Sequence, residues 1–204
     1  MSLIRLFDIV VSAIGLLILS PFLLIISFFI WNEDKHTPFF LQERVGLNFK
    51  LFRIVKFRSM SPNKSGLLIS SSTDKRITKT GAFIRKYKID EFPQLFNVLL
   101  GHMSLVGPRP EVAFYVNKYN KSQKEIIKVK PGITDYASIL YRNENELLSR
   151  SLNPEATYLN IIMPRKIRLN MVWVNNYSLR TYFDCIMRTL VHIIKYWWSR
   201  AMLI

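Results

Sequence analysis

The sequence predicts an α+β fold that is mostly helical, with an N-terminal membrane helix, a small β-hairpin and amphipathic helices around a compact core. Three observations support this class. An uncharged run extends from Ile9 to Ile30, and aromatic and β-branched residues cluster between Thr37 and Met60. From Ser178 to about Arg200, apolar residues recur with helical spacing. We expect a membrane anchor over residues 1–34 and one further domain over residues 35–204.

The composition narrows the class of protein. Half of the 204 residues are hydrophobic, yet the formal net charge is +15. This combination is typical of a protein on an anionic membrane surface, although a high pI also occurs in proteins that bind nucleic acid. The single cysteine, Cys185, excludes an internal disulfide and is expected to be a small apolar filler.

The uncharged run from Ile9 to Ile30 would form a helix about 33 Å long, enough to cross a bilayer core. No small-residue cleavage site follows it, so we interpret it as a retained anchor. Ser20 and Pro21 lie in its middle, and an internal proline kinks a helix because it removes one backbone hydrogen bond. A kinked spanning helix and a re-entrant hairpin both fit these residues, and both fit better than a buried core helix.

The segment from Thr37 to Met60 is predicted to form a β-hairpin around Gly46-Leu47-Asn48. One face of its second strand should be basic, because that strand carries Lys50, Arg53, Lys56 and Arg58. The basic face either is solvated or binds an anion. Residues 61–80 are polar and predict a loop.

The stretch from Ile89 to Gly101 predicts a helix with one apolar face, because four large residues fall at i, i+3, i+4 and i+7: Phe92, Leu95, Phe96 and Leu99. Pro93 is tolerated only in a first turn, so this helix should begin near Asp90. Asp90 and Glu91 then lie where free backbone N–H groups favour negative charge. They are either ordinary capping acids or part of a site for a phosphate or a metal–phosphate complex.

A rigid loop follows this helix. Pro108 and Pro110 restrict the backbone on both sides of Arg109. Such a loop either aims a guanidinium at a phosphate or holds it in a structural ion pair. Arg85 stands five residues before Asp90, so two arginines and two acids together suggest chemistry on a phosphorylated substrate with a divalent metal.

The last segment has the most regular periodicity in the chain. Its apolar stripe consists of Leu179, Tyr182, Phe183, Ile186, Met187, Leu190, Ile193, Ile194 and Trp197. A largely basic face lies opposite, which suits a helix lying in the membrane interface. Packing on the domain core is the alternative.

Four stretches of the chain, in their order and spacing, resemble the bacterial sugar transferases known as monotopic phosphoglycosyl transferases, which start glycan assembly on polyprenol phosphate. The matching stretches are Lys56 to Met60, Asp90 to Val98, Met103 to Glu111 and Pro131 to Thr134. Arg85 and the Ser20-Pro21 pair also match. The resemblance covers nearly the whole chain, and its length is that of the small members.

The resemblance implies a topology and a reaction. The anchor would be a re-entrant helix broken at Ser20-Pro21, beside a catalytic domain on the cytoplasmic face of the bacterial inner membrane. The Asp90 carboxylate would attack a UDP-sugar, and undecaprenyl phosphate would accept the phosphosugar from the aspartate. The implied partners are the UDP-sugar, undecaprenyl phosphate and membrane lipid, with no nucleic acid. The sugar, the glycan pathway and the oligomeric state stay open.

The resemblance also implies residue roles. Glu91 would bind Mg²⁺, while Arg85 and Arg109 would neutralise phosphate charge. Lys56 and Arg58 would line the same basic site. Without the resemblance, a membrane-anchored basic protein that binds lipid or nucleic acid without catalysis is the competing interpretation.

Three positions depart from the family pattern. Phe92 replaces a usual leucine, and His102 stands where aspartate is common. Asp135-Tyr136 follows Gly132-Ile133-Thr134, where many members have glycine and tryptophan. This last departure lies in a region expected to contact the nucleotide or the sugar, so it bears on the identity of the sugar.

Overall fold

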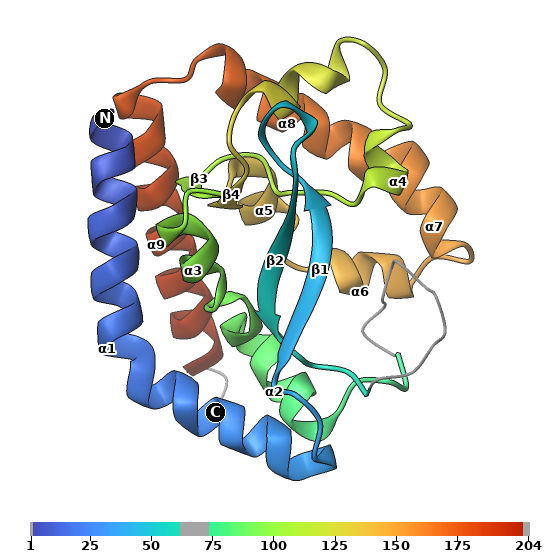
Figure 1. Ribbon diagram of the computed structural model, residues 1–204. Helices are drawn as coiled ribbons and strands as arrows, with labels where there is room; N and C mark the ends of the chain where they lie inside the picture. The colour runs from blue at the N-terminus through green and yellow to red at the C-terminus, as the bar shows by residue number, and fades with distance from the viewer. Residues whose placement is uncertain (1, 62–73, 202–204) are drawn as a thin grey trace.

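The computed structural model describes residues 2–61 and 74–201. A long N-terminal helix runs along one side of the molecule, a two-stranded hairpin crosses the middle, and shorter helices surround the hairpin (Figure 1). The predicted mostly helical α+β class with a small hairpin is therefore confirmed. Most of the loop predicted over residues 61–80 lies outside the described residues, since positions 62–73 are not described.

The described chain contains helices, single turns of tighter or wider helix, and two small sheets. The α-helices are α1 (Leu3–Asp34), α2 (Lys79–Tyr87), α3 (Gln94–Leu99), α4 (Ala113–Val116), α5 (Tyr136–Leu140), α6 (Glu144–Ser149), α7 (Pro154–Thr157), α8 (Met163–Asn175) and α9 (Leu179–Ala201). The 3₁₀ turns are η1 (Leu47–Phe49), η2 (Ile89–Glu91) and η3 (Gln123–Lys128), and η4 (Tyr158–Ile162) is a π turn. The strands are β1 (Phe39–Val45), β2 (Leu51–Phe57), β3 (Ser104–Val106) and β4 (Gly132–Thr134).

The predicted hairpin is confirmed. β1 and β2 are antiparallel, with Phe39 opposite Phe57 and Val45 opposite Leu51. The other edge of β2 pairs with a side chain of α3. Asn97 accepts from the Val55 N–H at 2.9 Å and donates to the Arg53 carbonyl at 2.8 Å, as a neighbouring strand would. This amide fixes α3 against β2.

The helix predicted to begin near Asp90 is divided in the structure. Asp90 and Glu91 lie in η2, and α3 begins only after Pro93. The reason is that Pro93 has no N–H to donate, so the preceding turn closes with i→i+3 bonds such as the 3.1 Å bond from the Phe92 N–H to the Ile89 carbonyl.

The apolar face predicted for this helix is partly wrong. Phe92, Leu95 and Leu99 pack, half-buried, against α1, but Phe96 is 45% exposed. The buried residues of α3 are Gln94, Asn97 and Val98. The helix therefore turns a mixed face toward β2, because the Asn97 amide is satisfied there by strand backbone groups.

Helix α1 continues through Pro21. The missing proline N–H would have bonded to the carbonyl of Leu17. The Ser20 hydroxyl donates to that carbonyl instead, at 2.7 Å. Figure 1 shows α1 changing direction part-way along its length, and an internal proline is the usual cause of such a bend.

Most apolar side chains of α1 point away from the protein. The helix is long and apolar enough to cross a membrane, and only 17% of its most apolar window is buried. Leu17, Ile18 and Leu24 are 75%, 70% and 71% exposed. A core helix would bury these side chains, and water would disfavour so large an apolar surface. The exposure indicates association with a membrane.

The N-terminal end of α1 is attached to the folded domain by two charged side chains. Arg5 donates to the carbonyls of Val98 and Leu99, at 2.6 and 2.9 Å, and so satisfies the end of α3. Asp8 is 2% exposed and accepts from the Tyr182 hydroxyl of α9 at 2.6 Å. Its carboxylate also accepts bonds from β3.

The C-terminal end of α1 is attached to the same domain. Glu33 accepts from the N–H groups of Lys79 and Thr80, at 2.8 and 3.1 Å, in the first turn of α2. Asp34 pairs with Arg58 at the end of β2, with one Nη2···Oδ1 contact of 2.6 Å. Both ends of the anchor helix are therefore held by one folded unit.

The C-terminal helix α9 covers the predicted segment and divides its apolar stripe between two environments. Tyr182 and Cys185 are fully buried beside Trp173 and Val106. Other stripe residues stay exposed, including Met187 at 58% and Ile194 at 64%. Cys185 is a buried apolar filler as predicted, and burial raises its thiol pKa to about 12.

Candidate active site

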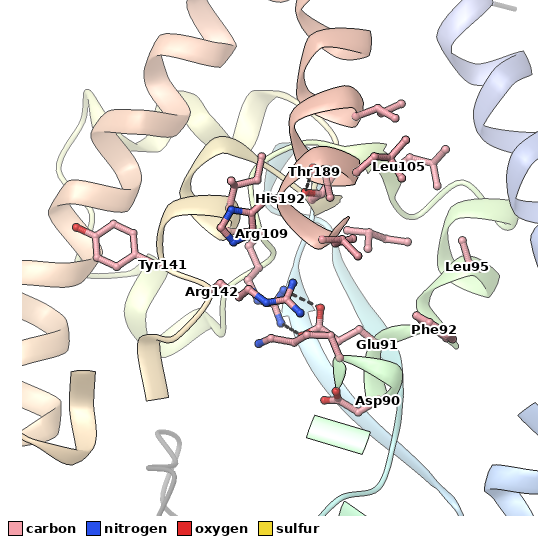
Figure 2. Close-up of a pocket in the computed structure, with 18 of the residues that line it drawn as sticks. Asp90, Glu91, Phe92, Leu95, Leu105, Arg109, Tyr141, Arg142, Thr189 and His192 are labelled. Atoms are coloured by element: carbon pink, nitrogen blue, oxygen red, sulfur yellow. Dashed lines mark hydrogen bonds and ion pairs between the residues drawn. The ribbon is translucent and has the colours of Figure 1, made fainter. Parts of the chain in front are cut away.

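A cavity of about 690 Å³ lies among α1, η2, the β3–β4 pair and α9. Its wall is charged at one end and apolar at the other (Figure 2). The charged groups are Lys56, Arg85, Lys88, Asp90, Glu91, Arg109, Arg142, Glu144 and Lys166. The apolar wall includes Phe7, Val11, Leu19, Phe92, Leu95, Leu105, Ile186, Leu190 and Ile193. The cavity thus suits a ligand with an anionic part and an apolar part.

The backbone turns sharply just before the two acids. Lys88 ends α2 in the left-handed conformation, with φ of 60°, and also begins η2. A non-glycine residue in this region is uncommon and is enriched at functional sites. The turn brings Asp90 and Glu91 close to Lys56 of β2.

Glu91 and Arg109 form the central ion pair of the cavity. Arg109 Nη1 donates to Glu91 Oε2 at 3.1 Å, and Nη2 donates to Oε1, so the pair is bidentate (Figure 2). Burial alone would raise the pKa of Glu91, but the charges of Arg109 and Lys56 outweigh burial and hold it well below its usual range. The Glu91 charge in turn raises the pKa of Arg109. Both groups are charged at neutral pH.

Asp90 differs from Glu91 in its surroundings. Its Oδ1 atom is buried and has no hydrogen-bond partner within the described residues. Burial raises the pKa of Asp90, the neighbouring Glu91 charge adds to this, and Lys56, Lys88 and Arg85 oppose it. An unpartnered buried carboxylate oxygen is costly unless a ligand uses it. Asp90 is therefore the carboxylate free to react or to bind.

Lys56 is the second cation beside Glu91, at 3.8 Å from Nζ to Oε1. Burial lowers its pKa to about 8, and the positive charge of Arg109 adds to this, against the opposing charge of Glu91. The amine is therefore charged at neutral pH and loses its charge a little above it.

The loop that carries Arg109 is held closely against β4. A side chain on Gly107 would place its Cβ 2.4 Å from the Lys130 carbonyl, so only glycine fits this approach. The Gly107 N–H donates to the Thr134 carbonyl at 3.0 Å, and the Pro108 carbonyl accepts from Gly132 at 3.1 Å. The predicted rigid loop therefore presents Arg109 from a fixed backbone.

Five of the site residues expected from the sequence line this one cavity: Lys56, Arg85, Asp90, Glu91 and Arg109. Arg58 is placed apart from them. Its Nε donates to the Thr37 carbonyl at 2.7 Å, and its guanidinium pairs with Asp34. β2 ends at Phe57, so Arg58 no longer follows the strand face that carries Lys56. Ser20 and Pro21 do not line the cavity, although the neighbouring Leu19 does.

Three cationic residues of the cavity were missed by the sequence reasoning. Lys88 directly precedes the acidic turn, and this adjacency was the available signal. Lys166 pairs with Glu144 at 2.7 Å, and Arg142 lies 4.3 Å from the centroid of the Tyr196 ring. Arg142 and Lys166 reach the cavity only through tertiary packing of α5, α8 and α9, which no local pattern specifies.

The donor set for a metal ion is small. Among the described residues, no group of three His, Cys, Asp or Glu side chains converges. Asp90 and Glu91 offer two adjacent carboxylates, and one oxygen of Asp90 has no hydrogen-bond partner in the part of the chain that the structure describes. Mg²⁺ commonly takes one or two carboxylates and completes its shell with water and substrate phosphates. These residues fit a magnesium ion shared with a phosphorylated substrate.

The fold and this site define a membrane-associated domain with a cavity that is charged at one end and apolar at the other. The chain belongs to the bacterial sugar transferase family, whose model matches residues 1–196. This membership argues against a non-catalytic binding protein.

Three relatives illustrate the range of similarity. The chain is 35% identical over 181 residues to a UDP-glucose:undecaprenyl-phosphate glucose-1-phosphate transferase of Klebsiella pneumoniae, covering 86% of this chain and 36% of the relative. It is 39% identical over 172 residues to the galactosyl transferase CpsE of Streptococcus agalactiae serotype III, covering 76% and 37%. It is 44% identical over 132 residues to a putative undecaprenyl-phosphate N-acetylgalactosaminyl 1-phosphate transferase of Bacillus subtilis, covering 64% and 70%. The first two relatives are thus matched over little more than a third of their length.

Proposed function

We propose that this protein transfers a sugar 1-phosphate from a UDP-sugar to undecaprenyl phosphate, the first membrane step of glycan assembly. An Asp90 carboxylate oxygen attacks the β-phosphorus of the UDP-sugar. The bond from that phosphorus to the bridging oxygen breaks, and UMP leaves with the oxygen and its electron pair. A phosphate oxygen of undecaprenyl phosphate then attacks the same phosphorus, and the Asp90 carboxylate leaves. The product is undecaprenyl-diphosphate-sugar.

The observation that carries this proposal is the contrast between the two acids. Glu91 is committed to Arg109 and Lys56, whereas Asp90, in the same cavity, has a buried oxygen without a hydrogen-bond partner among the described residues. A nucleophilic carboxylate needs a free oxygen directed at the electrophile. Burial strips water from that oxygen and, together with the Glu91 charge, raises the pKa of Asp90, whereas Lys56, Lys88 and Arg85 favour the charged form that attacks.

The cations have separable roles in this reaction. Arg109 is fixed at its backbone and presents two guanidinium N–H groups, so it suits the phosphate oxygens whose charge shifts as UMP leaves. Lys56 of β2 and Arg85 of α2 line the same cavity, and their charges act on Asp90. Binding of a diphosphate would share these cations between Glu91 and the substrate.

Mg²⁺ would be held by Glu91 once a bound diphosphate draws Arg109 and Lys56 partly away from this carboxylate. When bound, it would neutralise charge on the diphosphate and make the phosphorus more electrophilic. Glu91 keeps its negative charge for this purpose because Arg109 and Lys56 hold its pKa low.

The proposal includes a re-entrant anchor with the active site on the cytoplasmic face. Both ends of α1 bond to one folded domain, at Arg5 and Asp8 on one side and at Glu33 and Asp34 on the other. A helix that crossed the bilayer would separate its ends by about 30 Å of hydrocarbon. The bend and the exposed apolar face support an anchor that enters and leaves by one surface.

A direct test measures UMP release from a panel of UDP-sugars by protein in nanodiscs, with undecaprenyl phosphate and Mg²⁺. We expect release with one or a few sugars, and its loss in Asp90→Asn. Glu125→Gln, which changes a half-exposed acid in η3, is the control and should keep wild-type rates. Normal turnover by Asp90→Asn would overturn the assignment of Asp90 as the nucleophile. If no UDP-sugar of the panel releases UMP, the proposal that the donor is a UDP-sugar is overturned.

A further inference from the structure

Asp135 is a buried acid that the reaction above does not use. It is 1% exposed, directly follows β4 and precedes α5. Its position is one where the chain departs from the glycine that the family resemblance suggests. A buried carboxylate is costly unless several donors satisfy it.

Three donors satisfy the Asp135 carboxylate, and they come from three elements. Oδ1 accepts from the Ser138 N–H in the first turn of α5. Oδ2 accepts from the Arg109 N–H at 2.8 Å and from Asn170 Nδ2 of α8 at 3.4 Å. One oxygen therefore caps α5, while the other holds the backbone of the phosphate-binding arginine.

The bond to Arg109 is special because of the flanking prolines. Pro108 and Pro110 have no N–H group, so Arg109 supplies the only main-chain donor of this three-residue stretch. The two proline carbonyls are already bonded, to the Gly132 N–H at 3.1 Å and to Arg44 Nη1 at 3.2 Å. The Asp135 carboxylate accepts from the Arg109 N–H. It therefore fixes the loop at Arg109, whose side chain reaches Glu91.

We infer that Asp135 is a positioning residue, which sets the place of the Arg109 guanidinium through the Arg109 backbone. The inference rests on the proposed function only in taking the ligand of Arg109 to be a nucleoside diphosphate. Loss of a hydrogen bond to a charged group corresponds to roughly a tenfold change in binding or more.

The test is a double-mutant cycle with UDP and Mg²⁺ as the probe, read by calorimetry in nanodiscs. Asp135→Asn keeps the size of the side chain but removes its charge and leaves one acceptor oxygen where the Arg109 and Ser138 N–H groups need two. We expect it to weaken UDP binding about tenfold in the wild-type background and less than about twofold in the Arg109→Ala background. Equal losses in both backgrounds would reduce Asp135 to a general structural role and overturn the inference.

Two further variants separate positioning from helix capping. Asp135→Ser keeps a side-chain acceptor for the Ser138 N–H but has no second oxygen for Arg109. It should lose UDP binding as Asp135→Asn does, and wild-type binding would contradict the inference. Asn153→Ala removes a comparable cap from α7, where Asn153 accepts from the Ala156 N–H at 3.0 Å, and should leave UDP binding unchanged.

Failure of the proposed function is distinguishable from failure of this inference. UDP binding that depends on Arg109, without UMP release from any UDP-sugar, would count against the transfer reaction alone. If wild-type protein shows neither UDP binding nor UMP release, both proposals fall, because Arg109 then has no diphosphate to contact.

Discussion

Lys56 Nζ lies 3.8 Å from Glu91 Oε1, on the carboxylate that Arg109 also holds. The two cations therefore share one acid, and a diphosphate entering the cavity would meet both. Because Lys56 is the weaker base of the two, its protonation decides how much positive charge the site keeps as pH rises.

We expect the rate of UMP release to fall as pH rises through about 8. Burial lowers the pKa of Lys56 to about 8, so the amine is charged below this pH and neutral above it. Lys56→Arg stays charged and should move this alkaline limb upward by about one pH unit or more. A pH–rate profile measures both, with exposed Lys50→Arg as the matched control. If the alkaline limb stays at the same pH in Lys56→Arg, Lys56 is not the group that causes it.

Glu91→Gln should lower the UMP release rate about 100-fold and raise the Mg²⁺ concentration needed for half-maximal rate. The substitution keeps the shape of the side chain but removes the charge that pairs with Arg109 and would hold the metal. A Mg²⁺ titration of the initial rate measures both effects. If Glu91→Gln keeps the wild-type Mg²⁺ dependence, the ion does not contact this residue.

Asp8→Ala should destabilise the protein by about 3 kcal/mol, because it leaves buried partners on β3 and α9 unsatisfied. For a chain of this length that corresponds to a melting temperature lower by about 6–12 °C. Thermal unfolding in detergent micelles measures the shift. Glu125→Ala, which breaks an exposed pair with Lys128, should change it by less than about 2 °C. If Asp8→Ala also lowers the melting temperature by less than about 2 °C, Asp8 does not hold α1 against the folded domain.

Both ends of α1 should lie on one side of the membrane. We expect single cysteines at Ser2 and at Lys35, in a Cys185→Ser background, to resist a membrane-impermeant maleimide in spheroplasts. Both should react once the membrane is permeabilised. Labelling of one end alone from outside would establish a spanning helix despite Pro21.

Long patterns in the sequence were sufficient for the larger elements. The uncharged run predicts α1, the aromatic and β-branched run predicts the hairpin, and the apolar stripe predicts α9. Each pattern repeats over many residues, so one exception does not change the prediction. Neighbouring prolines made the Asp90-Glu91 pair and Arg109 candidates, and the family resemblance assigned their roles.

Details that depend on distant partners were not predictable. Arg58 follows Lys56 by two residues, which in a strand means the same face, but the strand ends between them and Asp34 binds Arg58. Phe96 fits the helical stripe, yet Asn97 occupies the buried face because β2 offers its backbone groups. The sequence identified Asp135 only as a departure from the family pattern, because its contact with Arg109 joins segments 26 positions apart.

The central claim is that Asp90 carries the phosphosugar during the reaction. Wild-type protein incubated with its active UDP-sugar and Mg²⁺, without undecaprenyl phosphate, should gain the mass of one sugar phosphate. Peptide mapping should place the adduct on Asp90, and added undecaprenyl phosphate should remove it. Mapping to another residue, or the same adduct in Asp90→Asn, would contradict the account.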